Sequence, residues 1–332
     1  MWRADRRWAP ALLPLLAAAC TVFNRVDTCD AQREGELQVN VGGSGDQFTT
    51  FARSLVQLPT GRYVAAWVSE PSAKEDSPSQ LMATLVTSGG TTLGCGRPNH
   101  EVQISMASDE VVGRFAVAVS PAEGSAVYFA WRATAVGAGG LGGRILARLM
   151  RQDLCDFAST PEVLVVSDPG ESVSAPSVAV RSDGREALVT WLSGPAPPWL
   201  FRVRSRPVGV MSDAYGAVEP NACDAMDSAC LHTHVALAAP PAITAFRDGY
   251  ALAWAQSRDT VLDGFEVKLQ LLGPSGKPLT DATGARPYAP VDGVDLAIAA
   301  SGDQVWLAHA GQPRATGGSA LDAEVFLERF SA

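Results

Sequence analysis

The sequence predicts an all-β protein, and three observations lead to this prediction. Of the 332 residues, 47% are hydrophobic and only 18% are charged, which provides enough apolar material for a large buried core. Val, Thr, Trp and Phe gather in short runs between turn residues, whereas apolar residues at helical spacing are scarce. One of these runs also recurs along the chain, which indicates a repeat architecture.

The recurring unit is a turn glycine followed by a short apolar run, and four of the five copies contain a tryptophan near the end of that run. The glycines lie 53 to 65 residues apart. The fifth copy lacks this tryptophan, and Leu307 is expected in its place. Tryptophans at one repeat position are expected to pack sheet against sheet instead of binding a ligand. The copies are Gly61–Glu70, Gly124–Trp131, Gly184–Trp191, Gly249–Trp254 and Gly302–Ala308.

Each copy is accompanied by three further strands. A turn that contains a glycine joins the tryptophan strand to the strand before it. Glycine is suited to such a turn because it accepts a positive φ. The strands before the tryptophan strand are expected at 51–58, 114–120, 177–181, 242–246 and 294–300. The strands after it are expected at 80–86, 144–150, 200–205, 265–271 and 324–330. Outer strands are expected at 36–41, 101–105, 162–166, 234–237 and 287–291.

Five repeats of four strands predict a five-bladed β-propeller of four-stranded antiparallel blades. The fold starts on an outer strand, 36–41, and ends on the strand 324–330, which precedes an outer strand in the repeat. We therefore expect the ring to be closed by pairing the N-terminal strand with the C-terminal strand, which removes two exposed edges. Over residues 36–330 the chain resembles the β-propeller repeat proteins among exported bacterial lipoproteins.

The first 19 residues have the features of a signal peptide, with arginines followed by an apolar stretch too short to span a bilayer. This segment leads into Leu16-Ala-Ala-Ala-Cys20, which resembles the lipobox of bacterial lipoproteins, although Ala17 stands where that family favours leucine. The resemblance implies that Cys20 is lipidated, and the alternative is ordinary cleavage after Ala19. The expected organisation is a signal peptide at 1–19, a lipidated cysteine and tether at 20–35, and a single propeller domain at 36–332.

No aspartate follows Cys20, so the lipoprotein resemblance implies an outer-membrane or cell-surface location, with a periplasm-facing one as the alternative. The net charge of −9 repels nucleic acid and anionic lipid. We therefore expect membrane attachment through the N-terminal lipid and no nucleic-acid partner.

The chain has six cysteines, of which five remain for disulfides in an exported protein once Cys20 is lipidated. With Cys20 lipidated, a disulfide between Cys223 and Cys230 is favoured, and one further pair among Cys29, Cys95 and Cys155 stays open.

Two further motifs resemble a zinc site and a dinucleotide-binding loop, but a structural interpretation is preferred for both. His232 and His234 follow Cys230 at zinc-ligand spacing, but a disulfide followed by strand residues is the preferred interpretation, so no metal is expected. The glycines of 137–142 match a dinucleotide fingerprint, but a strand and not a helix follows them, so no cofactor is expected.

The preferred function is a binding or scaffolding module whose glycan or protein ligand is unknown. The variable loops after the tryptophan strands are its expected ligand face, with Trp199 and Arg258 as candidate ligand-face residues. The alternative is a glycoside hydrolase-like enzyme, because five-bladed propellers resemble the arabinanase and invertase group, which carries acids on inner strands. Only Asp46 and Asp295 lie near the starts of the expected inner strands, so the sequence assigns no catalytic residue.

Overall fold

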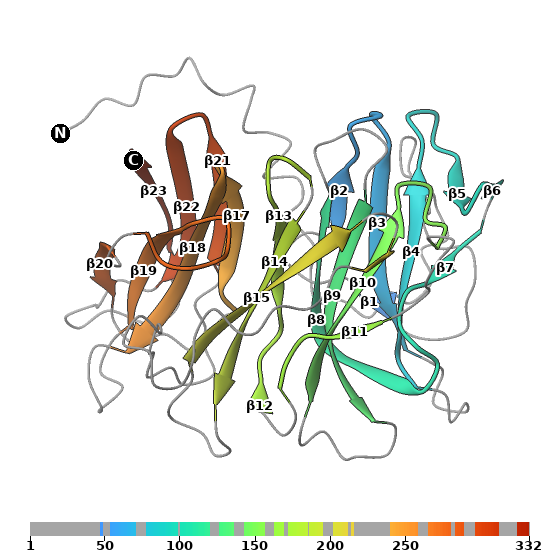
Figure 1. The fold of residues 1–332 in the computed structure, drawn as a ribbon, viewed down its shortest axis with the longest axis horizontal. Helices are drawn as coiled ribbons and strands as arrows, with labels where there is room; N and C mark the ends of the chain where they lie inside the picture. The colour runs from blue at the N-terminus through green and yellow to red at the C-terminus, as the bar shows by residue number, and fades with distance from the viewer. Residues whose placement is uncertain are drawn as a thin grey trace. The chain divides into compact units, whose positions relative to one another are not determined.

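Figure 1 shows the computed structural model of the protein. The chain divides into residues 1–38 and 39–332, and every described residue belongs to the second part. The described residues contain strands and no helix, and hence no helix long and apolar enough to span a membrane. The predicted all-β class is therefore confirmed. The structure describes residues 47–48, 54–70, 78–98, 100–119, 126–135, 143–156, 163–168, 172–184, 186–194, 202–211, 214–215, 240–257, 265–279, 283–288, 296–311 and 324–331.

The described strands form five sheets, each from one continuous part of the chain. Sheet 1 contains β1 (Gln47–Phe48), β2 (Leu55–Gln57), β3 (Tyr63–Ser69), β4 (Gln80–Val86), β5 (Thr92–Gly94), β6 (Arg97–Pro98) and β7 (Val102–Gln103). Sheet 2 contains β8 (Asp109–Val119), β9 (Ala126–Ala135), β10 (Arg144–Arg151) and β11 (Leu164–Val165). Sheet 3 contains β12 (Ser172–Val173), β13 (Ser177–Val180), β14 (Glu186–Gly194), β15 (Arg202–Met211) and β16 (Ala214–Tyr215). Sheet 4 contains β17 (Ala242–Phe246), β18 (Gly249–Ser257), β19 (Phe265–Leu272) and β20 (Thr283–Tyr288), and sheet 5 contains β21 (Leu296–Ser301), β22 (Gln304–Gly311) and β23 (Glu324–Ser331).

The sheets reproduce the predicted repeat. In each of them the tryptophan strand, or its counterpart β22, lies between the strand before it and the strand after it, and all pairs are antiparallel. The predicted outer strand of one repeat pairs with the last strand of the preceding repeat, as β7 does with β4 and β11 with β10. The outer strand expected at 287–291 is found earlier, as β20 on β19.

Sheet 5 differs from the other sheets because it has three strands among the described residues. In that part of the chain β23 pairs with β22 alone, and its second edge has no partner strand. The outer strand expected to pair with it, 36–41, lies outside the described residues. The number of blades and the closure of the ring therefore stay predictions.

The strand before each tryptophan strand forms one edge of its sheet, and these edges contact one another from sheet to sheet. Contacts join β2 to β8, β8 to β13, β13 to β17, and β17 to β21. Successive sheets thus contact one another through their edge strands, as the blades of a β-propeller do through their inner strands.

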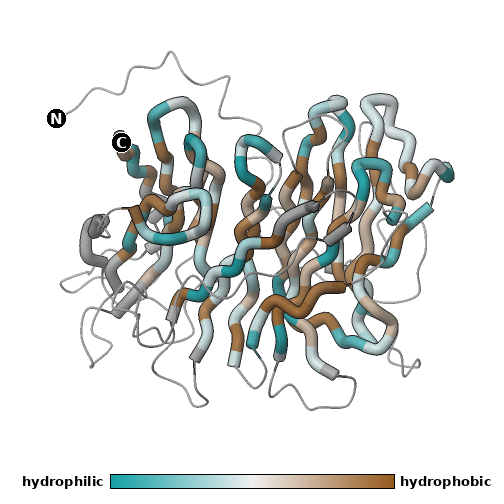
Figure 2. Tube along the Cα trace, in the orientation of Figure 1, coloured by the Kyte–Doolittle hydropathy of each residue, from teal (hydrophilic) through white to brown (hydrophobic). Residues whose placement is uncertain are grey.

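The tryptophans lie between the sheets, as predicted. Trp131 of sheet 2 is buried in one cluster with Ala66 and Ala83 of sheet 1. Trp191 of sheet 3 is buried with alanines of sheet 2, among them Ala130. A bulky face of one sheet therefore packs on a small-residue face of the preceding one, and the apolar segments concerned are visible in Figure 2.

The expectation that Leu307 replaces the missing tryptophan is wrong. Trp67, Trp131 and Trp191 each pair with the third residue of the following strand. Trp254 pairs instead with the fourth residue of β19, but like Trp131 and Trp191 it is the sixth residue of its strand. In sheet 5 the sixth residue of β22 is His309, which pairs with Phe326, the third residue of β23. Counting from the turn glycine misplaced the position, because the loops between the strands differ in length.

The turn glycines behave as predicted in three described turns, since Gly61, Gly184 and Gly302 have φ values of 78°, 72° and 56°. Sheet 4 differs, because Arg247 takes the left-handed conformation there, with φ 53°. Gly249 is needed for another reason, which is that a Cβ on it would collide with the carbonyl oxygen of Leu272.

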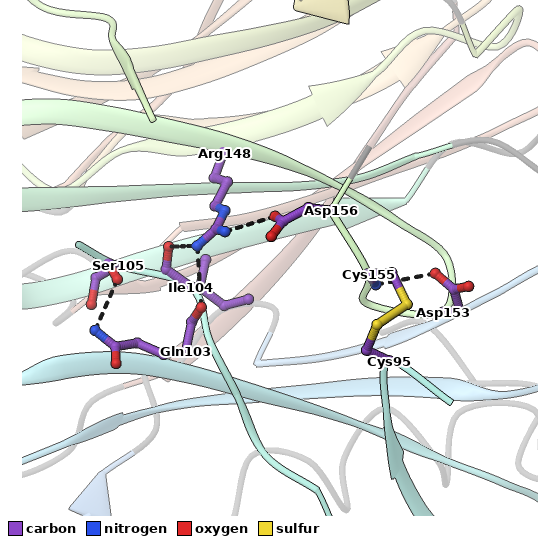
Figure 3. Close-up of polar contacts among 8 residues, drawn as sticks. All are labelled: Cys95, Gln103, Ile104, Ser105, Arg148, Asp153, Cys155 and Asp156. Atoms are coloured by element: carbon purple, nitrogen blue, oxygen red, sulfur yellow. Dashed lines mark hydrogen bonds and ion pairs between the residues drawn. A yellow bond between two sulfur atoms is a disulfide. The ribbon is translucent and has the colours of Figure 1, made fainter. Parts of the chain in front are cut away.

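The outer parts of sheets 1 and 2 are joined by a disulfide between Cys95 and Cys155, whose Cα atoms lie 4.5 Å apart. The structure thereby selects one of the pairings that the sequence left open. Beside it, Arg148 of β10 donates to the carbonyl oxygens of Gln103 and Ile104 in sheet 1, at 3.1 and 2.7 Å (Figure 3). A loop closed over about 60 residues contributes on the order of 4 kcal/mol to stability.

Candidate functional site at the inner end of sheet 2

The site residues predicted from the sequence all lie outside the described residues. They are Cys20, Trp199, Cys223, Cys230 and Arg258, together with Asp46 and Asp295 near the inner strands. The histidines of the rejected zinc motif lie outside as well. Within the described part of the chain, no three His, Cys, Asp or Glu side chains gather as a metal site.

The structure instead reveals two acidic residues on an inner strand where none was expected. The strand predicted at 114–120 begins earlier, at Asp109, so that Asp109 and Glu110 are its first two residues. The pairing with β9 shifts between Val111 and Phe115, and Gly113 in that interval has φ 71°. A glycine inside a strand pattern indicates such a bulge, and this was the signal in the sequence that could have extended the strand.

Asp109 is the most unusual polar residue of this strand. It is only 2% exposed, and its carboxylate Oδ1 lies 2.7 Å from Nη2 of Arg144. Its second oxygen, Oδ2, is buried and has no hydrogen-bond partner among the residues that the structure describes. A buried acceptor left without a partner costs about 1–3 kcal/mol, and more when it is charged. Among the buried side-chain atoms without a partner in the described part of the chain, Asp109 Oδ2 is the one carboxylate oxygen. Such an atom requires an explanation, for example an ordered water, a ligand or a catalytic role.

The backbone around Asp109 is held in place by sheet 1. The side-chain amide of Gln80 donates to the Asp109 carbonyl oxygen at 3.3 Å, and the Asp109 N–H donates to Met106 at 3.1 Å. The other end of the Gln80 amide accepts a hydrogen bond from Ser105 Oγ at 2.7 Å. The position of the carboxylate is therefore set by two sheets and not by a loose loop.

The opposite face of the same strand end carries a second pair of charged residues. Glu110 is paired with Thr134, so its side chain leaves the sheet on the side away from Asp109. Arg132, two residues before Thr134 on β9, is on that side as well, and burial lowers the pKa of its guanidinium below the ordinary value. The starts of β8 and β10 lie beside the end of β9, and we call this part of the sheet the inner end of sheet 2. It carries one carboxylate and one arginine on each face.

Asp109 and Arg144 have the polar groups that a polyhydroxy ligand requires, but the buried Asp109 carboxylate reaches such a ligand only if its surroundings open. A carboxylate and a guanidinium accept and donate hydrogen bonds to adjacent hydroxyl groups. A carboxylate with a free acceptor oxygen can also serve as a base or nucleophile, provided that a second carboxyl group lies about 5–10 Å away.

The comparisons with known proteins place the chain among distant structural relatives only. No protein-family profile matches the sequence, and no curated protein matches it. A solved α-L-arabinanase of Penicillium chrysogenum in complex with arabinobiose matches with TM-score 0.48 and 11% identity, over 82% of this chain and 76% of that chain. The α-L-arabinofuranosidase Arb93A of Fusarium graminearum matches with TM-score 0.46 and 12% identity, over 83% and 76%.

A third solved structure is described as a β-propeller. It is the β-propeller domain of the Trilobed protease of Pyrococcus furiosus, with TM-score 0.38 and 9% identity over 84% of this chain and 69% of that chain. Likenesses at this distance carry no information about activity or ligand.

Proposed function

We propose that the chain is an exported, lipid-anchored β-propeller that hydrolyses a glycan at the inner end of its sheets. The observation that carries this proposal is Asp109 on an inner strand, a buried carboxylate with one oxygen that has no partner among the described residues. Inner strands are where the arabinanase and invertase group, which five-bladed propellers resemble, carries its acids. The alternative function considered from the sequence is thereby preferred to a pure binding module.

Hydrolysis requires a second carboxyl group, and the sequence offers a specific one. Asp46 directly precedes β1, which pairs with the inner side of the tryptophan strand of sheet 1. Sheet 1 neighbours sheet 2 at the inner edge through β2 and β8. We propose Asp46 as the partner of Asp109, with Asp295 as the next candidate.

A glycan-binding module without catalysis is the second candidate function. It is favoured by the ion pair between Asp109 and Arg144, because a carboxylate held by an arginine can bind ligand hydroxyls without taking part in proton transfer. Trp199 and Arg258 keep their proposed role on the ligand face in either case.

The two functions are separated by one experiment on a lipid-free form of the chain that begins at residue 21. Plant and bacterial glycans are screened for binding and for release of reducing ends, with the wild type and with Asp109→Asn. We expect hydrolysis by the wild type and a loss of at least about a hundredfold in the variant. Asp153→Asn is the matched control, because that carboxylate lies in the outer turn next to the disulfide and should leave activity unchanged.

The other outcomes of this screen are also informative. Binding without hydrolysis that weakens in Asp109→Asn supports the binding module. Equal hydrolysis by the wild type and Asp109→Asn contradicts a catalytic role for this residue. Neither binding nor hydrolysis of any glycan contradicts both functions.

We also propose the lipid anchor at Cys20, which rests on the lipobox resemblance. Replacing Cys20 with Ser is expected to release the protein from the membrane fraction, as measured by fractionation and immunoblotting. Unchanged fractionation would contradict lipid attachment at this residue.

The fold proposed for this function is a ring of five blades. This ring is supported by the first and the last sheet, sheets 1 and 5. Each has one face that is turned away from its neighbouring sheet, and the side chains on these two faces are complementary in size. Sheet 1 presents Trp67 on the face away from sheet 2, and sheet 5 presents Ala297 and Ala299 on the face away from sheet 4. Tryptophan faces pack on alanine faces in the described contacts, so these two faces are suited to each other.

Closure through strand pairing is the second part of the fold proposal. The second edge of β23 needs an outer strand, and residues 36–41 alternate apolar and polar side chains as such a strand requires.

A further inference from the structure

The disulfide between sheets 1 and 2 starts at the tip of a short hairpin. Two residues, Cys95 and Gly96, join β5 to β6, since Gly94 pairs with Arg97. Cys95 and Gly96 have φ values of 47° and 73°, and a positive φ at both central residues is typical of a type I′ turn. Asn, Asp or Gly usually occupies the first of these positions, because other residues are unfavourable there. Cys95 instead holds this position, and it is exposed.

The other half of the bridge comes from the turn that follows β10. Leu154, next to Cys155, is also left-handed, with φ 58°. Among the described residues that are not glycine, three have a positive φ, and Cys95 and Leu154 are two of them. A residue with a Cβ is unfavourable in this conformation and keeps it only where neighbouring contacts impose it. The bridge therefore joins two turns that both carry backbone strain.

Local hydrogen bonds hold the two turns close to each other. The Cys95 N–H donates to the carbonyl oxygen of Asp153 at 2.9 Å, and the Cys155 N–H donates to the Asp153 carboxylate at 3.1 Å (Figure 3). Sheets 1 and 2 are also joined independently of the bridge, by Arg148 and by the apolar cluster around Trp131. Opening the bridge would therefore release the hairpin without separating the two sheets.

We propose that the Cys95–Cys155 bridge is a redox-sensitive latch, which a dithiol protein opens in the folded state by attacking the sulfur of Cys95. Exposed and strained disulfides are reduced more easily than buried and relaxed ones. Attack at Cys95 is favoured over attack at Cys155, because Cys95 is exposed and Cys155 is half-buried. The hairpin from Thr92 to Pro98 is the element that the latch holds.

The reaction is a two-step exchange. A thiolate of the dithiol attacks Cys95 Sγ, the bond between the two protein sulfurs breaks, and Cys155 leaves as a thiolate that takes a proton from water. The second thiolate of the dithiol then attacks the dithiol sulfur of the mixed disulfide and releases Cys95, which is protonated in turn. The bridge gains two electrons, and the dithiol is oxidised to a disulfide.

The first test asks whether reduction occurs in the folded protein. The lipid-free chain from residue 21 is treated with dithiothreitol, and alkylation of each cysteine is followed by mass spectrometry of its peptides. We expect a rate for Cys95 and Cys155 that is proportional to the dithiothreitol concentration and changes less than about twofold in urea below the unfolding transition. Reduction through the unfolded chain would instead accelerate by about tenfold or more per molar urea. That result would overturn the proposal.

The second test identifies the sulfur that is attacked. Glutathione replaces dithiothreitol, and iodoacetamide is present to alkylate the thiol that is released. We expect glutathione on Cys95 and the alkyl group on Cys155. The reverse pattern, or equal amounts of both patterns, would contradict attack at the exposed half of the bridge.

The third test measures what opening the latch does. Hydrogen exchange is compared with and without dithiothreitol, and we expect the hairpin amides to exchange at least about tenfold faster after reduction, while β8 and β9 stay unchanged. The double variant Cys95→Ser/Cys155→Ser is the control for the other cysteines of the chain, and dithiothreitol should not alter exchange in its hairpin.

Two results of the third test would overturn the latch. Equal acceleration in the double variant would assign the effect to another bridge. No acceleration in the wild type would show that the disulfide does not hold the hairpin. If the double variant does not fold, the first two tests decide.

Discussion

Sheets 2 and 5 are built from the same repeat, but they are supported differently. Sheet 2 has four strands, packs through Trp131 on sheet 1 and through its alanines on sheet 3, and carries one half of the disulfide. Sheet 5 has three strands among the described residues and packs on sheet 4 through one face. Its other face leaves Leu327 57% exposed.

The two sheets differ in their neighbours and not in how completely their strands pair. The strands β21–β23 pair without a register shift, whereas β8 has a bulge against β9. Among the described residues, sheet 5 has no cover for one face and no partner for one edge, and the proposed ring closure provides both.

The largest expected effect concerns the packing of sheet 2. Trp131→Ala should lower the free energy of unfolding by about 3–5 kcal/mol, because it leaves a cavity between sheets 1 and 2. Denaturant unfolding measures this loss, and Trp131→Phe is the control, with a smaller loss because most of the volume is retained. A loss below about 1 kcal/mol would mean that the tryptophan position does not carry the contact between the sheets.

The next effect concerns the disulfide that supports sheets 1 and 2 but not sheet 5. Replacing Cys95 and Cys155 together with Ser should lower the free energy of unfolding by about 2–4 kcal/mol. Hydrogen exchange should accelerate first in β4–β7 and β10–β11. Faster exchange in β21–β23 without a change in β4–β7 would contradict the local role of the bridge.

A smaller effect is expected at alkaline pH on either side of sheet 3. The pKa values of Tyr128 and Tyr250 are raised above 10, mainly by burial and further by Glu186. Stability is thus complete below the unfolded pKa of about 10 and is lost as the pH rises above it, because the unfolded chain releases the phenolic protons first. Tyr128→Phe should reduce this loss between pH 9 and 11 in thermal unfolding, and an unchanged profile would contradict the assignment.

Much of the fold could be predicted from the sequence, because apolar runs, turn glycines and repeat spacing all indicate the same strands. Where the prediction failed, a local irregularity was responsible. The bulge at Gly113 interrupts the strand pattern of β8, so the sequence predicts a strand from residue 114 and leaves Asp109 outside it. The loop lengths shifted the count in sheet 5, so that Leu307 was preferred to His309.

The candidate site was harder to predict for a physical reason. A buried carboxylate can be recognised only when its strand, its burial and its partner are known together, and Arg144 is distant from Asp109 in the sequence. The pairing of Cys95 with Cys155 was likewise undecided, because spacing alone does not reveal which outer turns meet in space.

Closure of five blades into a ring through residues 36–41 can be tested by hydrogen exchange of β23. Its amides that point away from β22 are compared in the mature chain and in a chain that lacks residues 36–41. The account predicts slow exchange of these amides in the mature chain and fast exchange in the deletion, with β8–β10 unaffected. Fast exchange in both proteins would contradict closure by this strand.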